Sequence, residues 1–458
     1  MKQTTPNFTE GPIFSPLVRF AFPVLLALFL QTMYGAVDLL IVGQFGGALA
    51  DVYVSAVSTG SQLMHTVTIV ITGLAMGLTV FVGNRIGAGQ REEAGRIIGS
   101  GIGLFGVIAA ALTVVLVLSA PSLARVMNAP AEAYAATVSY LVICSAGTVF
   151  IIAYNLVGSI FRGLGDSKMP LVTVAAACVL NIGGDLLLVA GFGMGAAGAA
   201  FATVFAQAAS VLLSLFIIRK RELPFILTAG DLRPRGLYVK QILKLGIPIA
   251  LQDLLVSISF LVIIAIVNGL GLTASAGVGV AEKLCGFLML VPSAYMQSMS
   301  AFVAQNIGAE KPERAGKALV YGVLSSLAVG VFIGYFTFFH GELLAGIFAK
   351  DGGIILAAAD YLRAYAIDCV LTSFLFCFVG YFNGCGSTTF VMLQGISGAF
   401  GVRLPVSWLM SRQADVSLFR IGLATPASTA VQILLCGAYF VTLLHRQRQS
   451  CHPGETDL

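Results

Sequence analysis

Charged residues are scarce in this sequence. Lys, Arg, Asp and Glu make up 10% of its 458 residues, whereas they make up about 25% of an ordinary soluble chain. Hydrophobic residues make up 58%, and the mean hydropathy is +0.94. Because so few charges cannot cover a surface that faces water, most of the surface must face lipid. The composition therefore predicts an integral membrane protein and excludes soluble enzymes, secreted disulfide scaffolds and disordered regulators.

Patterns for metal, disulfide and nucleic-acid chemistry are missing as well. The eight cysteines lie mostly in apolar stretches, without CxxC pairs or neighbouring histidine clusters, which argues against a metal site and a disulfide framework. The net charge of +5 is too small for a nucleic-acid-binding protein of this length. We therefore expect no cofactor, no metal and no nucleic-acid partner.

Long apolar segments are what the sequence does contain. A spanning helix needs about 20 apolar residues, and segments of this kind lie near residues 16–42, 53–82, 96–119, 134–161, 169–191, 196–218, 241–267, 275–303, 315–339, 358–382, 388–411 and 420–444. They lack the alternation of barrel strands, and the first lacks the short core and cleavage site of a signal peptide. The predicted fold class is an all-α integral membrane protein with twelve transmembrane helices.

Basic residues indicate how these spans are oriented. They gather in the loops after spans 2, 4, 6, 8 and 12, at Arg85, Arg91, Arg96, Arg162, Lys168, Arg219, Lys220, Arg221, Arg233, Arg235, Lys240, Lys311, Arg314, Lys317, Arg446 and Arg448. Loops between them, such as residues 44–51, are poorly basic. Because an excess of Lys and Arg marks the cytoplasmic side, both termini are expected in the cytoplasm.

The sequence also contains an internal repeat. Residues 81–96 align with residues 302–317, and residues 161–167 align with residues 382–388 at the same spacing. Six spans return the chain to its starting side, so the two halves have parallel orientation. The expected organisation is a cytoplasmic segment at residues 1–15, a six-helix bundle at 16–218, a cytoplasmic linker at 219–240, a second six-helix bundle at 241–444 and a cytoplasmic tail at 445–458. Paired bundles of this kind commonly work by rocking around a central site, which favours a carrier over a channel.

Five motifs resemble those of the multidrug and toxic compound extrusion (MATE) family. They are FPVLLALFLQTMYGAVDLLIVGQFG in span 1, NRIGAGQREEAGR after span 2, RGLGDSKMP after span 4, VLNIGGDLLL in span 5 and GAAGAAFATV in span 6. The resemblance extends over about residues 16–444, and the N-terminal half resembles the DinF-like branch more than the NorM-like branch. It implies a MATE/MOP-type fold and a bacterial or archaeal inner-membrane antiporter. Such a protein exports organic, often cationic, compounds in exchange for H⁺ or Na⁺.

Ionisable residues inside the spans are the candidate functional residues. An Asp at a helix centre costs about 2.5 to 3.5 kcal/mol on insertion, so it persists where it faces a cavity or a partner. Asp38 lies in span 1, and its spacing from Gln31 and Tyr34 places all three on one helical face. Asn181 and Asp185 share a face of span 5 in the same way.

Paired carboxyl groups are suited to proton coupling. Desolvation and a neighbouring carboxylate both favour the protonated form of a carboxyl group, so Asp38 and Asp185 together would gain and lose a proton. The alternative is that Asp185 and Asn181 only hold span 5 against a neighbouring helix. The family resemblance implies a proton-sensitive network in the first half, and its positions match Asp38, Gln31, Tyr140, Asn181, Asp185 and Thr203 here. Tyr140 and Thr203 are equally consistent with helix packing.

The C-terminal half offers Asp253, Glu282 and Asp368 as secondary candidates. NorM-like relatives place a functional Glu and Asp at positions that fall on Val256 and Thr372 here. This departure favours H⁺ over Na⁺ as the coupling ion, although a Na⁺ site of Asp368 with backbone carbonyls stays open. Arg403 in span 11 is interpreted as a counter-ion of one of these acids or as part of a structural pair.

Two other functions compete with drug export. A lipid-linked oligosaccharide flippase of the same superfamily should have a basic central cavity, whereas the charges inside these spans are mainly acidic. An intramembrane enzyme should bring catalytic groups together, and the sequence offers no Ser/Lys, Ser/His or paired-Asp motif of an intramembrane enzyme and no HExxH motif. The chain is therefore interpreted as a monomeric transporter of small organic compounds and not as an enzyme.

Overall fold

The computed structural model describes residues 8–220, 225, 227–413 and 415–451. Residues 1–7 of the expected N-terminal segment, Arg221 in the expected linker, and residues 452–458 of the expected tail lie outside the described part, as do the side chains of Arg446 and Arg448. Throughout the described residues the regular structure is helical, which confirms the all-α prediction.

The helices follow one another along the chain with short connections. Their bounds are α1 (Phe14–Phe45), α2 (Ala50–Gly87), α3 (Arg91–Val126), α4 (Tyr134–Ala146), α5 (Thr148–Gly163), α6 (Lys168–Asp185), α7 (Gly195–Lys220), α8 (Gly236–Asn268), α9 (Leu272–Leu288), α10 (Leu290–Gly308), α11 (Pro312–Ala345), α12 (Gly352–Gly384), α13 (Thr388–Gly398), α14 (Leu404–Ser411), α15 (Leu418–Gly422) and α16 (Ala424–Cys451). Eleven spans within the described residues are long and apolar enough to cross a membrane. The bent pair α4 and α5 brings the number to twelve.

Four of the expected spans are interrupted, although the sequence predicted continuous helices. Span 4 bends by 52° between α4 and α5, at Gly147, where a Cβ atom would lie 2.4 Å from Val204 of α7. Span 8 breaks between α9 and α10, at Met289. Spans 5 and 11 each contain a π-helical segment, at Leu186–Gly191 and Ala399–Arg403. The length of an apolar segment predicts that the segment crosses the membrane. It does not predict the contacts with neighbouring helices that bend the helix.

The repeated motifs adopt the same local structure in both halves. The first motif pair connects α2 to α3 and α10 to α11, and the second connects α5 to α6 and α12 to α13. Left-handed residues occur at equivalent places, with φ of 74° at Gly89 and 57° at Glu310, and 84° at Gly165 and 77° at Gly386. Each pair ends one helix and redirects the chain into the next.

The chain forms two compact units. The first consists of Met1–Leu254, Gln297–Ala318 and Asn383–Thr388, and the second of the remaining segments, Leu255–Met296, Leu319–Phe382 and Thr389–Leu458. The domain boundaries expected from the repeat stay a prediction.

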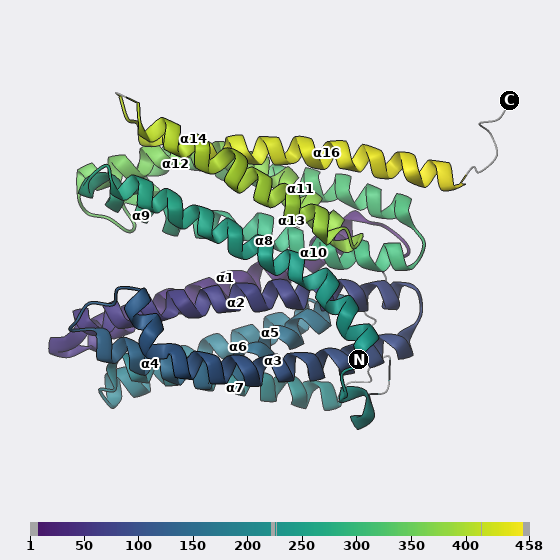
Figure 1. Ribbon diagram of the computed structural model, residues 1–458, viewed down its shortest axis with the longest axis horizontal. Helices are drawn as coiled ribbons and strands as arrows, with labels where there is room; N and C mark the ends of the chain where they lie inside the picture. The colour runs from purple at the N-terminus through teal and green to yellow at the C-terminus, as the bar shows by residue number, and fades with distance from the viewer. Residues whose placement is uncertain (1–7, 221–224, 226, 414, 452–458) are drawn as a thin grey trace. The chain divides into compact units, whose positions relative to one another are not determined.

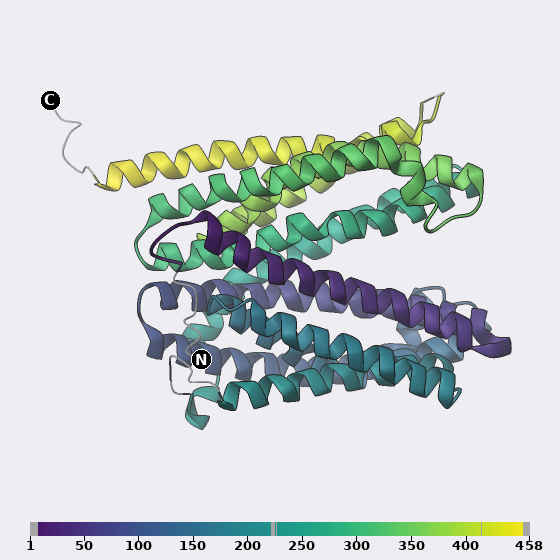
Figure 2. The same ribbon diagram turned by 180° about the vertical axis from the view of Figure 1, so that it is seen from behind.

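In the first unit, α1 to α7 run side by side (Figures 1 and 2). Helix α6 packs against α1 and α7, and α2 packs against α4 and α5. The core around α2 contains Leu78, Ile97, Phe105 and Ile152, all of which are fully buried. The contacts of α6 with α1 and α7 hold these three helices together.

In the second unit, a separate core is built from α8, α9, α12 and α15. It contains Ile263, Val278, Leu362, Tyr365 and Ile421.

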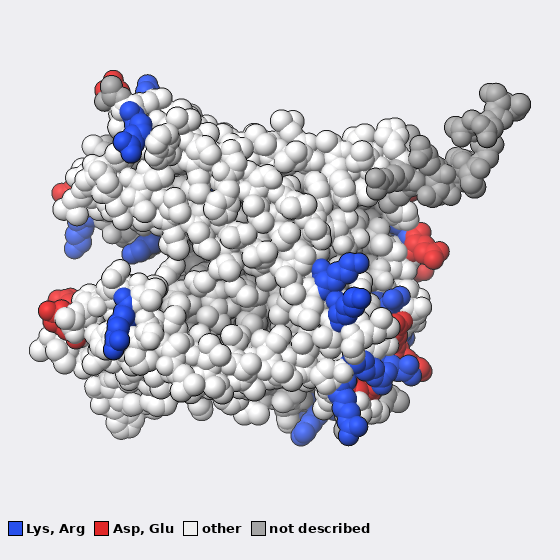
Figure 3. Space-filling model, viewed as in Figure 1, with Lys and Arg blue, Asp and Glu red and all other residues white. Residues whose placement is uncertain are grey.

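Charged side chains lie toward the helix ends on the face shown in Figure 3, and a wide white band without charged residues separates them. This distribution is that of helices whose middle parts face hydrocarbon and whose ends face water.

Candidate functional site

Two acidic side chains from different helices meet inside the first unit. Asp38 lies on α1 and Asp185 is the last residue of α6, and the two carboxyl groups lie beside one another. Asp38 is 5% exposed and Asp185 is fully buried. The packing of α1 against α6 therefore brings together the two carboxyl groups that the sequence singled out.

Asn181 and Thr203 complete this carboxyl cluster. The Thr203 hydroxyl on α7 donates to Asp38 Oδ2 at 3.4 Å and to the Ala199 carbonyl oxygen at 3.0 Å. Asn181 Nδ2 donates to Thr203 Oγ1 at 3.4 Å. Asp38, Asn181, Asp185 and Thr203, from spans 1, 5 and 6, thus lie in one network.

Three of the four carboxyl oxygens in the cluster lack a hydrogen-bond donor among the described residues. Asp38 Oδ1 and both carboxyl oxygens of Asp185 are buried and accept no hydrogen bond from the described residues. A single proton on either carboxyl group would become a donor between them. Because an unmet buried acceptor is costly and two close carboxylates disfavour double ionisation, this geometry is suited to holding one exchangeable proton.

Tyr34 and Tyr140 lie beside the cluster. Tyr34 interacts electrostatically with Asp38 and makes side-chain hydrogen bonds with Gln31 and Gln207. Tyr140 is close to Asp38 and Tyr34, and its ring lies against Gly60 of α2. The structure therefore brings together every first-half residue that the sequence selected. Gln207 was missed, although its position one turn after Thr203 on α7 could have suggested it.

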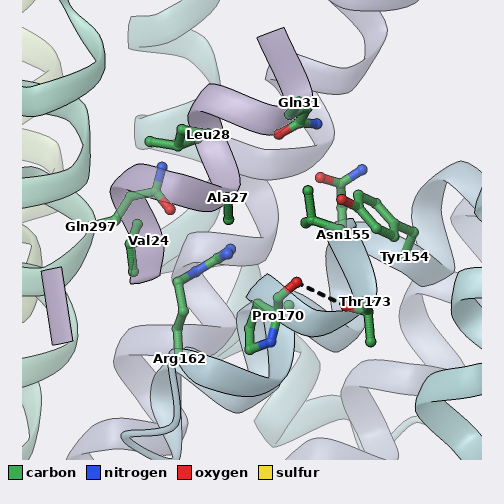
Figure 4. Close-up of a pocket in the computed structure, with 12 residues that line it drawn as sticks. Val24, Ala27, Leu28, Gln31, Tyr154, Asn155, Arg162, Pro170, Thr173 and Gln297 are labelled. Carbon is green, nitrogen blue, oxygen red and sulfur yellow. Dashed lines mark hydrogen bonds between the residues drawn. The ribbon is translucent and has the colours of Figure 1, made fainter. Parts of the chain in front are cut away.

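A small cavity lies beside the N-terminal half of α1. Its volume is about 50 Å³, and its lining consists of Val24, Ala27, Leu28, Gln31, Tyr154, Asn155, Gly158, Arg162, Pro170, Thr173, Val174 and Gln297 (Figure 4). The Arg162 side chain points into the space between Val24, Ala27 and Gln297. From the sequence, Arg162 was used only as one of the basic residues that indicate the cytoplasmic side, because a residue at the end of a span resembles a loop residue.

The C-terminal candidates lie in two places. In the second unit, the Tyr361 hydroxyl donates to Glu282 Oε1 at 3.2 Å, and the Arg403 guanidinium interacts electrostatically with both Glu282 and Asp368. Its Nη1 donates to Ser259 Oγ at 3.1 Å, and the group lies 4.3 Å from the centroid of the Phe260 ring. Arg403 is thus near the two acids without a direct ion pair among the described residues. Asp253 lies on α8 within the first unit.

Among the described residues, no three His, Cys, Asp or Glu side chains are grouped as metal ligands would be.

Buried carboxyl groups enclosed by membrane-spanning helices are typical of a membrane transporter. The chain belongs to the MatE family: the family model matches residues 23–187 and, a second time, residues 248–409. The resemblance to the multidrug and toxic compound extrusion family is therefore confirmed. The DinF-like branch stays a prediction.

Relatives cover nearly the whole chain. It is 24% identical over 447 residues to the probable multidrug resistance protein YoeA of Bacillus subtilis, with 95% of both chains covered. It is also 24% identical to the multidrug export protein MepA of Staphylococcus saprophyticus, with 98% of this chain and 97% of that protein covered.

Solved structures of transporters have the same fold. One is described as the outward-facing conformation of a multidrug resistance MATE family transporter of the MOP superfamily, with a TM-score of 0.88 at 21% identity, covering 98% of this chain and 99% of that chain. A MOP superfamily transporter from Pyrococcus furiosus has the same score, identity and coverage. The comparison establishes the fold.

Proposed function

We propose that this protein exports organic compounds, cationic or amphipathic in character, in exchange for H⁺ by alternating access. The observation on which the proposal depends is the contact between Asp38 and Asp185, with buried carboxyl oxygens that lack donors among the described residues. Membership of the MatE family and the names of the relatives support multidrug efflux as the general activity.

Competition between the proton and the cargo provides the coupling. A protonated Asp38 and Asp185 pair carries less negative charge, so it favours release of a cationic compound. The ionised pair attracts the cation, and the bound cation offsets the repulsion between the two carboxylates. In an electrogenic exchange, each net charge that moves down a potential of 100 mV supplies about 2.3 kcal/mol, which corresponds to roughly fifty-fold accumulation of cargo.

Cellular location, topology and oligomeric state belong to the same proposal. We place the protein in the inner membrane of a bacterium or archaeon with both termini in the cytoplasm, acting as a monomer without a cofactor and without enzymatic activity. Na⁺ is the alternative coupling ion, with Asp368 and neighbouring backbone carbonyls as its ligands. A lipid-linked oligosaccharide flippase is less well supported, since the buried cluster on α1 and α6 is acidic.

Transport in proteoliposomes tests this function. Purified protein is reconstituted, and the uptake of a fluorescent organic cation is followed with H⁺ and Na⁺ gradients imposed separately. We expect the H⁺ gradient to drive transport and Asp38→Asn to abolish it. Asp51→Asn, an exposed residue in the first turn of α2, serves as the matched control. Undiminished transport by correctly inserted Asp38→Asn contradicts the assignment.

A further inference from the structure

Arg162 is a cation inside the first unit without an acidic partner in the cavity that it enters. Its Nη2 donates to Ser159 Oγ at 2.8 Å, and its Nε is buried with no hydrogen-bond partner among the described residues. None of the side chains that line the cavity is Asp or Glu. A guanidinium group offers five N–H donors, so most of its capacity to bind an anion is unused.

The neighbouring groups are also suited to an anion. The Tyr154 hydroxyl is buried and unpartnered among the described residues, and it can donate a hydrogen bond. The side-chain amides of Gln31, Gln297 and Asn155 line the same space (Figure 4). Asn155 is already fixed, because its Nδ2 donates to the Ile151 carbonyl oxygen at 2.8 Å and its Oδ1 accepts from Thr72 at 3.2 Å. A carboxylate placed here would satisfy Arg162 and Tyr154 together.

A purely structural role explains less of this geometry. Arg162 lies in the last turn of α5, where a cation interacts favourably with the helix dipole. That interaction does not require the Nε atom and the Tyr154 hydroxyl to be buried without partners. Unmet buried donors are unfavourable unless a ligand or water occupies the site.

The cavity and the carboxyl cluster are connected through α1. Val24, Ala27, Leu28 and Gln31 line the cavity, and their spacing of three and four residues continues to Tyr34 and Asp38 on the same helical face. Gln31 also makes a side-chain hydrogen bond with Tyr34. At 1.5 Å per residue, Gln31 lies about 10 Å from Asp38 along the helix, and Val24, beside the Arg162 side chain, lies about 21 Å from it.

We propose that the Arg162 cavity binds an anionic group of the cargo, so that the transporter favours amphoteric compounds that carry a carboxylate as well as a cationic centre. The carboxylate binds at Arg162 and Tyr154, and the cationic centre lies toward Asp38. A volume of about 50 Å³ admits one functional group or a few water molecules rather than a whole drug molecule. This inference rests on the proposed export function and specifies its substrate class.

A matched pair of dyes tests the inference. A rhodamine methyl ester is a permanent cation, and the corresponding free acid is a zwitterion with nearly the same shape. Binding to the purified full-length protein is measured by fluorescence anisotropy, which does not depend on transport. We expect the wild type to bind the acid more tightly than the ester, and Arg162→Gln to weaken the acid relative to the ester by about tenfold. Arg162→Lys should recover part of this preference, because it restores the charge but not the planar fork.

Controls separate the subsite from the proposed function. Arg125→Gln removes an exposed arginine from the last turn of α3 and should keep the wild-type ratio of affinities. Equal affinity of the wild type for both dyes, or an equal loss of both in Arg162→Gln, overturns the subsite, and the wild-type comparison needs no variant to fold. Transport of both dyes under an H⁺ gradient is measured in parallel. Acid-selective binding without any transport contradicts the export function and leaves the anion site supported.

Discussion

The carboxyl group of Asp185 lies against that of Asp38, and neither of its oxygens accepts a hydrogen bond from the described part of the chain. The two residues are far apart in sequence and come from different helices. In the proposed function they form a single proton-binding unit.

The first prediction concerns the coupling between these residues. We expect Asp38→Asn and Asp185→Asn each to reduce H⁺-driven accumulation to background, from as much as roughly fifty-fold for each net charge moved across 100 mV. The double variant should be no worse than either single variant, because residues that act as one unit are not additive. Accumulation ratios in proteoliposomes give the comparison. Partial losses that add in the double variant would show two independent sites.

The second prediction concerns pH. Protons and a cationic cargo compete for the carboxyl pair, so the affinity for a rhodamine ester should rise as the pH rises and the pair loses its proton. Asp185→Asn removes one of the two titrating groups and should flatten this dependence. Equilibrium binding measured by fluorescence anisotropy across the pH range checks both statements. An affinity of the wild type that falls as the pH rises would contradict the proposed competition between protons and the cation.

The third prediction concerns the segment that precedes α1. Arg314 donates from Nε to the Phe8 carbonyl oxygen at 2.9 Å and from Nη1 to that of Gly11 at 2.7 Å, while the Phe8 ring is fully buried 5.0 Å from the Phe302 ring. We expect Arg314→Gln to destabilise the fold by about 1 to 2 kcal/mol, since bonds from a charged donor are lost. A lower Tm and faster proteolytic cleavage before Phe14 are the readouts.

Lys317 provides the control for this contact. It is exposed one turn later on α11, so Lys317→Gln should leave both readouts unchanged. If Arg314→Gln and Lys317→Gln behave alike, the bonds to the N-terminal carbonyl groups contribute no stability.

The fourth prediction concerns the close contact of α2 with α8. A Cβ atom on Gly77 would lie 2.6 Å from the Gly246 backbone nitrogen and 2.7 Å from the Ile242 carbonyl oxygen, and backbone atoms cannot move aside cheaply. Gly77→Val should therefore destabilise the protein by about 1 to 3 kcal/mol or more. Gly106→Val on α3 has no atom within 4 Å of the new Cβ and should be neutral. Thermal unfolding in detergent, followed by size-exclusion chromatography, distinguishes them.

The fifth prediction uses the two copies of the repeat against each other. Gly89 and Glu310 both adopt positive φ, and a Cβ on Gly89 meets nothing within 4 Å. Gly89→Ala should thus cost about 1 kcal/mol through backbone strain alone. Glu310→Gly should relieve the same strain and not lower the Tm. A loss of stability in Glu310→Gly would show that its side chain has a role beyond the turn.

Sequence patterns succeeded where the physical cause is local. The length of each apolar run predicted the spans because the hydrocarbon core sets that length, and the repeat predicted matching turns because the same residues redirect the chain at Gly165 and Gly386. Asp38 and Asp185 could be selected because a buried charge is costly wherever it occurs. The bend at Gly147 and the π-helical segments could not be predicted, since they depend on neighbouring helices.

The amino-acid sequence by itself determined that this chain spans a membrane, that it consists of two related halves, and which acidic residues deserve a functional assignment. Those properties follow from composition, hydrophobic length and the cost of burying charge, none of which requires a partner helix. Only the tertiary structure decided which side chains meet. It places Thr203 beside Asp38 and Gln207 beside Tyr34, and it points the Arg162 side chain into a cavity. Such contacts arise from the packing of helices that are distant in sequence.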